Sequence, residues 1–236
     1  MIPYDKEQTL IAIHIPKSAG TSVRKVFKQW FHPTSFFTHY YDEKKGKPPR
    51  QVDLESLARK RASVFSSITR RPNRPICIYG HFPRARGYGV ESRFPEVKQF
   101  VTIMRDPFET ALSTYHYLRK AGENWKDRSS IPKVELEEYL LNTPSRVLDH
   151  FPRELTRDNY EEVIDTYFVD IGLTERLEES LAHIATALGK KFDPRQLGQL
   201  NVTERTTPSP QGLRELHREK NLLEYLVYEH VKSIRY

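Results

Sequence analysis

An apolar run that is followed by a small-residue turn and an amphipathic helix occupies residues 9–27, and it constrains the fold more than any other stretch. Residues 10–15 are rich in β-branched side chains and are interrupted only by His14. Such a run is typical of a strand that is covered on both faces of a parallel sheet. Pro16 ends the run, and apolar residues at helical spacing begin at Val23. The stretch therefore predicts a strand, a sharp turn and a helix in quick succession.

The turn between this strand and helix has a composition suited to holding an anion. It consists of Lys17, Ser18, Ala19, Gly20, Thr21 and Ser22. Small residues at a helix N-terminus leave backbone N–H groups unobstructed, and the helix dipole favours negative charge there. The Lys17 ammonium and two hydroxyl groups add further donors. We interpret the turn as a cradle for a phosphate or sulfate group, with an ordinary strand-to-helix turn as the alternative. It is not a Walker A loop, because Lys17 precedes Gly20.

Length and charge limit the possible partners without choosing among them. With 236 residues the chain can form one α/β domain or two small ones. The net charge of +7 favours an anionic partner, such as a phosphate compound, an acidic polysaccharide, nucleic acid or a membrane surface. The single cysteine, Cys77, excludes an internal disulfide. No apolar run reaches membrane-spanning length and no signal peptide is evident, so we expect no membrane span and a cytoplasmic protein.

A second strand, turn and helix are expected within residues 99–120. Asp106 suits a helix N-cap, and Arg105 stands at the junction between strand and helix. Ser113 lies about two turns into the helix, so it can face the same crevice as the guanidinium. An Arg and a Ser that converge there suit a second phosphate, because the guanidinium offers forked donors to phosphate oxygens. The alternative is that Arg105 pairs with Asp106 or Glu109.

His81 follows a third predicted strand, residues 76–79, and the intervening Gly80. Functional groups collect beyond the carboxyl ends of parallel strands, so this position is favourable for chemistry. A lone histidine at a strand end is more often structural, and its weight here comes from the two anion-binding turns. The other histidines show no metal-ligand spacing, so we expect no metal site. We interpret His14 as a hydrogen-bonded core residue.

Taken together, these motifs carry a resemblance to a known family. Residues 15–22 resemble the 5′-phosphosulfate loop of sulfotransferases that use 3′-phosphoadenosine 5′-phosphosulfate (PAPS), and residues 105–107 with Ser113 resemble their 3′-phosphate motif. Gly80-His81 and residues 115–119 are most similar to the heparan sulfate and uronosyl 2-O-sulfotransferase group. The resemblance runs from about residue 11 to 181, with Ser18 where Thr is commoner.

The resemblance implies a P-loop-like, three-layer α/β fold with a central parallel sheet flanked by helices. It implies one domain over residues 1–236, with a donor-binding core at about 9–120 and 160–190 and a C-terminal loop and helix at 198–236. PAPS is the implied donor, His81 the base that deprotonates an acceptor hydroxyl, and Lys17 the cation at the leaving oxygen. Arg205, in the late loop, would contact the 3′-phosphate unless that loop is an exposed linker. No metal and no nucleic acid partner are implied.

The sequence is compatible with several alternatives. The expected acceptor is a saccharide hydroxyl, but lipid-linked sugars, small metabolites and protein tyrosine are also compatible with the scaffold. The function could instead be that of a P-loop-like phosphotransferase, which would need a magnesium-binding acid, or that of a non-catalytic polyanion-binding module. The oligomeric state cannot be inferred.

The remaining elements are predicted from spacing alone. Residues 30–49 are expected to form a loop, and 166–171 a strand. Helices are expected at 136–148, at 177–188 and, as one continuous element, at 213–234.

Overall fold

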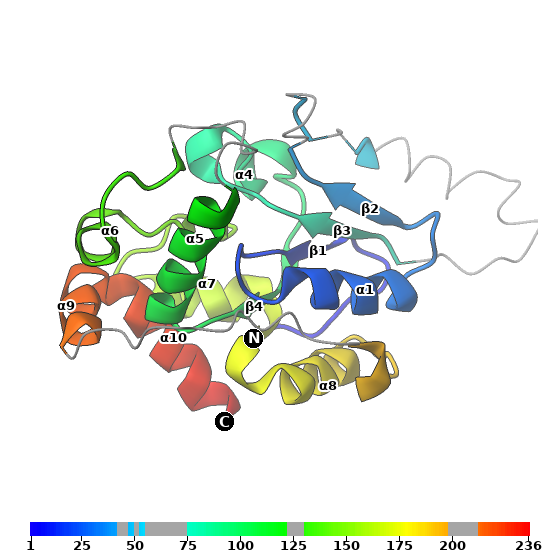
Figure 1. The fold of residues 1–236 in the computed structure, drawn as a ribbon. Helices are drawn as coiled ribbons and strands as arrows, with labels where there is room; N and C mark the ends of the chain where they lie inside the picture. The colour runs from blue at the N-terminus through cyan, green and yellow to red at the C-terminus, as the bar shows by residue number, and fades with distance from the viewer. Residues whose placement is uncertain (42–46, 50–51, 55–74, 122–129, 198–211) are drawn as a thin grey trace, which may run out of the picture.

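The computed structural model describes residues 1–41, 47–49, 52–54, 75–121, 130–197 and 212–236. Within these residues the chain builds a five-stranded sheet with the strand order β2-β3-β1-β4-β5 (Figure 1). Every pairing in the sheet is parallel. The strands are β1 (Leu10–Ile13), β2 (Phe36–His39), β3 (Cys77–Gly80), β4 (Gln99–Met104) and β5 (Phe168–Leu173).

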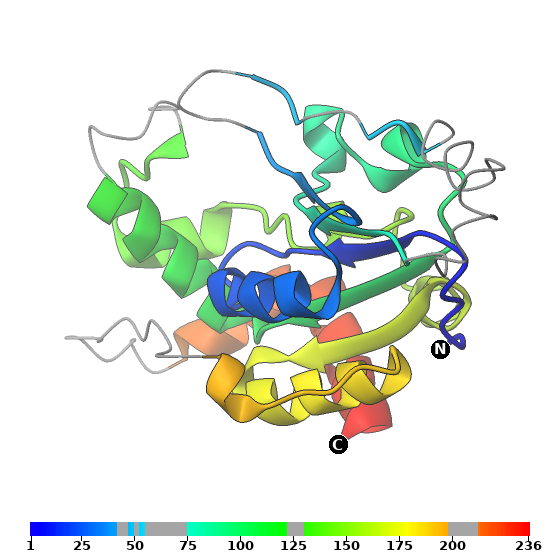
Figure 2. The ribbon, with the colours of Figure 1, turned by 90° about the vertical axis from the view of Figure 1, so that its right-hand side faces the viewer.

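Helices cover both faces of the sheet, which confirms the predicted three-layer α/β fold. Two of them, α1 (Gly20–Trp30) and α8 (Leu177–Ala187), pack on one face around Phe27 and Leu181 (Figure 2). The opposite face carries α4 (Val90–Arg93), α7 (Tyr160–Tyr167) and α10 (Leu222–Arg235). A third, smaller core lies among α5 (Pro107–Ala121), α6 (Leu136–Asn142) and α9 (Leu213–Lys220). Short 3-10 helices are η1 (Arg84–Arg86), η4 (Leu148–His150), η5 (Thr174–Arg176) and η6 (Pro194–Gln196).

The central strands are apolar for the reason expected from the sequence. Each residue of β1, β3 and β4 is buried, because helices lie on both sides of these strands. On α1 the buried side chains recur at helical spacing, at Val23, Val26, Phe27 and Trp30, and they face the sheet.

The strand register brings three carboxyl ends together at one edge. Ile13, the last residue of β1, pairs with Gly80 of β3 on one side and with Thr102 of β4 on the other. The chain leaving β1 enters α1 on one face, whereas the chain leaving β3 reaches α4 on the opposite face. Neighbouring strands whose connections diverge in this way leave a crevice beyond their ends, where ligands of α/β proteins bind.

Two predictions from spacing are wrong. Residues 36–39 were expected to lie in a loop but form β2, an edge strand that pairs with β3 over only four residues. The C-terminal helix is two helices, α9 and α10, with Asn221 between them. The Asn221 side chain donates to the carbonyl oxygen of His217 at 2.9 Å, and this local bond competes with continuation of the helix.

Other boundaries differ by a few residues. The expected strand 166–171 begins at Phe168, and the expected helix 136–148 ends at Asn142, before Pro144. Among the described residues, no helix has the length and apolar character needed to cross a membrane.

Candidate functional site

The turn between β1 and α1 has an unusual backbone. Lys17 and Ala19 adopt left-handed conformations, with φ angles of 67° and 54°. Residues with a Cβ atom rarely adopt this conformation, and such strain is concentrated at ligand-binding sites. Ala19 is the N-cap of α1, and within the described residues no side chain caps that end and no acidic residue lies in its first turn. The end of the helix dipole therefore keeps its positive character.

Ser18 supplies the strongest indication that a ligand belongs in this turn. Its side chain is buried, with 2% of its surface exposed, yet its Oγ has no hydrogen-bond partner within the described part of the chain. A buried hydroxyl without a partner costs about 1–3 kcal/mol. An anion held by the turn would supply the missing acceptor. Thr21 is exposed and Ser22 half-buried, so both hydroxyl groups lie near the surface of the same turn.

The Lys17 ammonium extends from this turn toward α5. Its Nζ lies 4.0 Å from the centre of the Tyr117 ring, which is a cation–π contact. Burial lowers the pKa of Lys17, and the nearby charge of Arg105 lowers it further. Tyr117, on α5, therefore contacts a predicted site residue.

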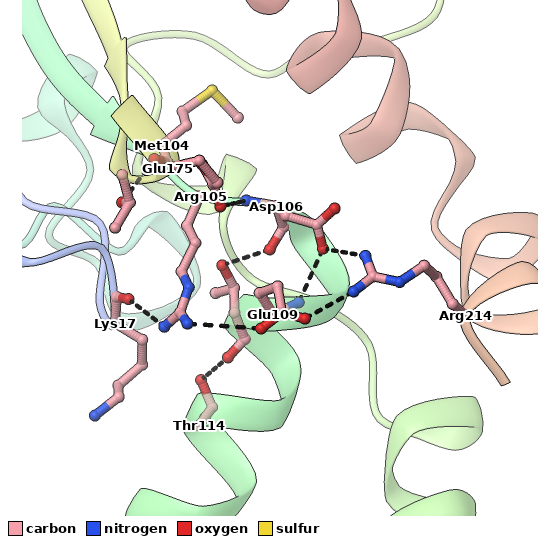
Figure 3. Close-up of polar contacts among 10 residues, drawn as sticks. Lys17, Met104, Arg105, Asp106, Glu109, Thr114, Glu175 and Arg214 are labelled. Atoms are coloured by element: carbon pink, nitrogen blue, oxygen red, sulfur yellow. Dashed lines mark hydrogen bonds and ion pairs between the residues drawn. The ribbon is translucent and has the colours of Figure 1, made fainter. Parts of the chain in front are cut away.

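Arg105 lies directly beyond β4 and reaches the turn from the other side (Figure 3). Its guanidinium donates to the carbonyl oxygen of Lys17 at 3.3 Å and pairs with Glu109 at 3.7 Å. The pairing with Glu109 is the alternative that the sequence left open, and it coexists with the contact to the anion-binding turn. A guanidinium has five N–H donors, so these two contacts leave donors for a further acceptor.

A second arginine shares the same carboxylates. Arg214, in α9, donates to Asp106 at 2.8 Å and to Glu109 at 2.7 Å (Figure 3). Glu109 therefore bridges Arg105 and Arg214, and α9 is attached to the loop beyond β4. Of the other predicted site residues, Ser113 is half-buried on α5, and Arg205 lies outside the described residues.

His81 lies just beyond β3 and contacts a second histidine. Its Nε2 is 2.9 Å from Nδ1 of His14, the residue that follows β1, and Nδ1 of His14 is also 2.8 Å from the Tyr40 hydroxyl. Burial lowers the pKa of His81 to about 4, with smaller contributions from Arg86 and His39. Burial and the neighbouring His81 likewise lower the pKa of His14. At neutral pH His81 is thus an uncharged imidazole.

Two further buried histidines support this one. His39 Nδ1 is 2.9 Å from the carbonyl oxygen of His81, and His150 Nδ1 accepts from the backbone N–H of Phe82 at 3.1 Å. Both contacts hold the peptide bond that joins His81 to Phe82. Burial lowers the pKa of His150 to about 3 and also lowers that of His39, so both rings are neutral as well.

The three predicted functional side chains therefore lie beyond adjacent strands at one sheet edge. His81 follows β3, Lys17 follows β1 and Arg105 follows β4, and the residues around Lys17 contact both of the others. The arrangement combines an anion-binding turn with two cations and a neutral imidazole. Chemically it can hold an anionic group and accept a proton next to it.

His14 and Tyr40 are parts of this site that the sequence did not identify. His14 was expected to be a hydrogen-bonded core residue, and it is hydrogen-bonded, but its partners are Tyr40 and the candidate base. The local sequence gives no signal for this contact, because it depends on which residue of β3 pairs with Ile13.

Comparison with known proteins identifies no family for this chain. No protein-family model and no curated protein sequence matches it. Among solved structures, mouse sulfotransferase SULT7A1 complexed with PAP is similar at a TM-score of 0.45 and 15% sequence identity. The match covers 95% of this chain and 79% of the mouse protein. A likeness this low supports neither the fold nor the function, which depend on the geometry described above.

Proposed function

We propose that this protein is a sulfotransferase that moves a sulfuryl group from PAPS to an acceptor hydroxyl, with a saccharide as the expected acceptor. The observation that supports it most is the buried Ser18 hydroxyl, which has no hydrogen-bond partner among the described residues. It lies in a strained turn next to the Lys17 cation, and the neutral His81 imidazole follows the neighbouring strand. The motif resemblance described from the sequence supplies the identity of the donor.

The residues present fit an anionic nucleotide at both ends. In this proposal the turn 17–22 holds the phosphosulfate through its backbone N–H groups and the Ser18 hydroxyl. Lys17 leaves the Tyr117 ring to neutralise charge on the leaving phosphate oxygen. Arg105 binds the 3′-phosphate with the donors that Lys17 and Glu109 do not use, and Ser113 and Arg205 are proposed to assist it. When bound, the donor supplies the electrophilic sulfur.

His81 is the proposed base. Sulfuryl transfer resembles phosphoryl transfer in that in-line positioning and charge stabilisation do most of the work. An uncharged imidazole can take the proton of the acceptor hydroxyl as the new O–S bond forms, which contributes roughly 10²- to 10⁴-fold in rate. We therefore expect His81→Ala to lower kcat by that factor and to leave donor affinity nearly unchanged.

Calorimetry with adenosine 3′,5′-bisphosphate tests donor recognition. A lost hydrogen bond to a charged group is worth about 1.5–3 kcal/mol, so Lys17→Ala and Arg105→Ala should each weaken binding about 10- to 150-fold. Lys28→Ala is the matched control, because Lys28 is exposed in the last turn of α1, and this variant should bind adenosine 3′,5′-bisphosphate like the wild type. Binding that ignores both site substitutions would refute the proposed donor site.

Transfer itself is tested with ³⁵S-labelled PAPS and a panel of hydroxyl acceptors, including polysaccharides, small sugars and tyrosine peptides. Release of adenosine bisphosphate coupled to a labelled acceptor supports the proposal. Magnesium-dependent transfer of phosphate from ATP in the same panel would point to a phosphotransferase instead. Polyanion binding that survives both Lys17→Ala and His81→Ala, and falls steeply with salt, would point to a non-catalytic binding module.

A further inference from the structure

We infer that His14 is a positioning residue for His81: its Nδ1 accepts a hydrogen bond from Nε2–H of His81 and so leaves Nδ1 of His81 as the nitrogen that receives the proton. The catalytic consequence rests on the proposed function, because it presumes that His81 is the base. The hydrogen bond between the two rings does not depend on the proposed function. It can be measured on the protein without any substrate.

The contact between the two rings follows from the sheet. Ile13 pairs with Gly80, and the His14 N–H donates to the Gly80 carbonyl oxygen at 2.7 Å, so the parallel register continues past the ends of both strands. Residues at the same level of neighbouring strands point to the same side. His14 and His81 therefore meet, with 2.9 Å between Nδ1 and Nε2 and 4.4 Å between ring centres.

The ring of His14 makes further contacts. It stacks on Tyr79 at 5.7 Å between ring centres, and its Nδ1 lies 2.8 Å from the Tyr40 hydroxyl. A Cβ atom on Gly20 would stand 1.6 Å from its Nε2, so the ring occupies the space that a side chain at the start of α1 would need. His14 is thus wedged between the anion-binding turn and the candidate base, and it is well placed to fix the orientation of His81.

Only one proton arrangement of this pair leaves His81 able to act as a base. A neutral imidazole has one N–H and one lone pair. If Nδ1 of His14 carried the hydrogen and donated to His81, then Nδ1 of His81 would also carry a hydrogen and could accept none. If instead Nε2–H of His81 donates to His14, Nδ1 of His81 keeps its lone pair. In that arrangement the single lone pair of His14 Nδ1 accepts from His81 Nε2–H, and the Tyr40 hydroxyl, 2.8 Å from the same nitrogen, shares that lone pair as a second donor.

This arrangement also stabilises the charge that develops during transfer. The acceptor O–H proton passes to Nδ1 of His81 as the acceptor oxygen bonds to sulfur. The bond from sulfur to the leaving phosphate oxygen breaks, and its electron pair remains on that oxygen beside Lys17. The resulting His81 imidazolium keeps its Nε2–H bond to His14, which becomes charge-assisted and stronger.

The charges around the two rings make the hydrogen-bond acceptor on His14 important. In the part of the chain that the structure describes, the groups that act on the two rings are positive or uncharged and none is an acid: Lys17, Arg24, His39, Tyr40, Tyr79, Arg86 and His150. Burial and this positive neighbourhood both disfavour an imidazolium. A lone pair directed at Nε2–H is therefore a large part of what makes protonation of His81 accessible.

Nitrogen-15 NMR of the histidine rings tests the inference without turnover. In the wild-type protein at pH 7, we expect long-range ¹H–¹⁵N correlations to show His81 in the Nε2–H tautomer. His14→Asn, whose amide oxygen can replace Nδ1, should keep that tautomer, and His14→Leu should convert His81 to a mixture. His183→Ala, a half-buried ring on α8 far along the chain, is the control for general effects. The inference would be overturned if His81 of the wild type carried its hydrogen on Nδ1. It would also be overturned if the His81 tautomer were the same in the wild type and in His14→Leu.

Kinetics with PAPS provide the second readout. We expect His14→Leu to lower kcat about 10- to 100-fold while the dissociation constant for adenosine bisphosphate changes less than about threefold. The acidic limb of its pH–rate profile should move to lower pH, because His81 loses the acceptor that favours its protonated form. His14→Asn should recover most of the rate. Equal impairment of both variants, or matched losses of kcat and donor affinity, would make His14 merely structural. Absence of any transfer in the wild type would refute the proposed function, and the NMR result would still decide the tautomer.

Discussion

A pair of Ala→Gly substitutions measures the backbone strain at the anion-binding turn. Ala19 has a φ angle of 54°, and the left-handed conformation costs a residue with a Cβ atom about 1–2 kcal/mol. Ala19→Gly removes this cost, but glycine makes the unfolded chain freer by about 0.4–1 kcal/mol. It also deletes a half-buried methyl group, worth about 0.4 kcal/mol. The net expectation is a protein about 0.4 kcal/mol more stable than the wild type.

Ala182→Gly is the matched control. Ala182 is exposed in the middle of α8, where glycine costs about 1 kcal/mol relative to alanine. The unfolded-state term is common to both substitutions and cancels in the comparison. The two variants should therefore differ by about 1.4 kcal/mol, which corresponds to about 3–6 °C in Tm for a chain of this size.

Urea and thermal unfolding followed by circular dichroism measure this difference. If Ala19→Gly lowers the free energy of unfolding as much as Ala182→Gly does, the turn is not strained and the reasoning is refuted. Calorimetry on the same variant adds a functional readout. A more flexible turn must be ordered when it binds an anion, so we expect adenosine bisphosphate to bind a few-fold more weakly.

Two further substitutions, one of them with a matched control, test contacts outside the turn. Burial raises the pKa of Glu224 to about 7 from 4.5, so the folded state holds the proton more tightly than the unfolded state does. The free energy of unfolding of the wild type should therefore fall by about 3 kcal/mol as the pH rises from about 4.5 to 7. Glu224→Gln should remove this dependence in urea unfolding at pH 5 and pH 8, and parallel pH slopes for the two proteins would contradict it. Arg214→Ala should lower the free energy of unfolding by about 0.5–1.5 kcal/mol, because two partly buried pairs are lost. Arg195→Ala, which removes the pair between the exposed Arg195 and Asp193, should leave the unfolding midpoint unchanged. An equal effect of the two substitutions would show that the Arg214 pairs contribute nothing specific.

The parts of the fold that local patterns determine could be predicted from the sequence. The apolar run before Pro16 and the one before Arg105 are long enough to identify β1 and β4. The helix after β4 begins at Pro107, directly after the expected N-cap Asp106, whereas α1 begins at Gly20, three residues before the apolar spacing at Val23. By contrast, β2 has only four residues, and its aromatic side chains also suit a loop. Its existence depends on pairing with β3, which is a long-range contact.

In the candidate site, too, the features that depend on local sequence could be predicted and those that depend on long-range contacts could not. Lys17, His81 and Arg105 could be placed at one sheet edge, because each follows a predicted parallel strand. Their partners could not, because they depend on register and on packing between distant elements. His14 meets His81 across 67 residues, and Arg214 meets Asp106 across 108. No local spacing encodes either contact.

The bond from Arg105 to the main chain of Lys17 has a consequence for how the site is assembled. The side chain proposed for one end of the nucleotide also supports the peptide that carries the cation at the other end. The two proposed halves of the site are therefore joined by a hydrogen bond before any ligand binds. Arg105→Ala would remove a ligand contact and a brace at once, whereas Arg105→Lys keeps the positive charge but lacks the forked donors. The difference between these two variants, more than either alone, would reveal how much affinity comes from a prebuilt shape and how much from charge.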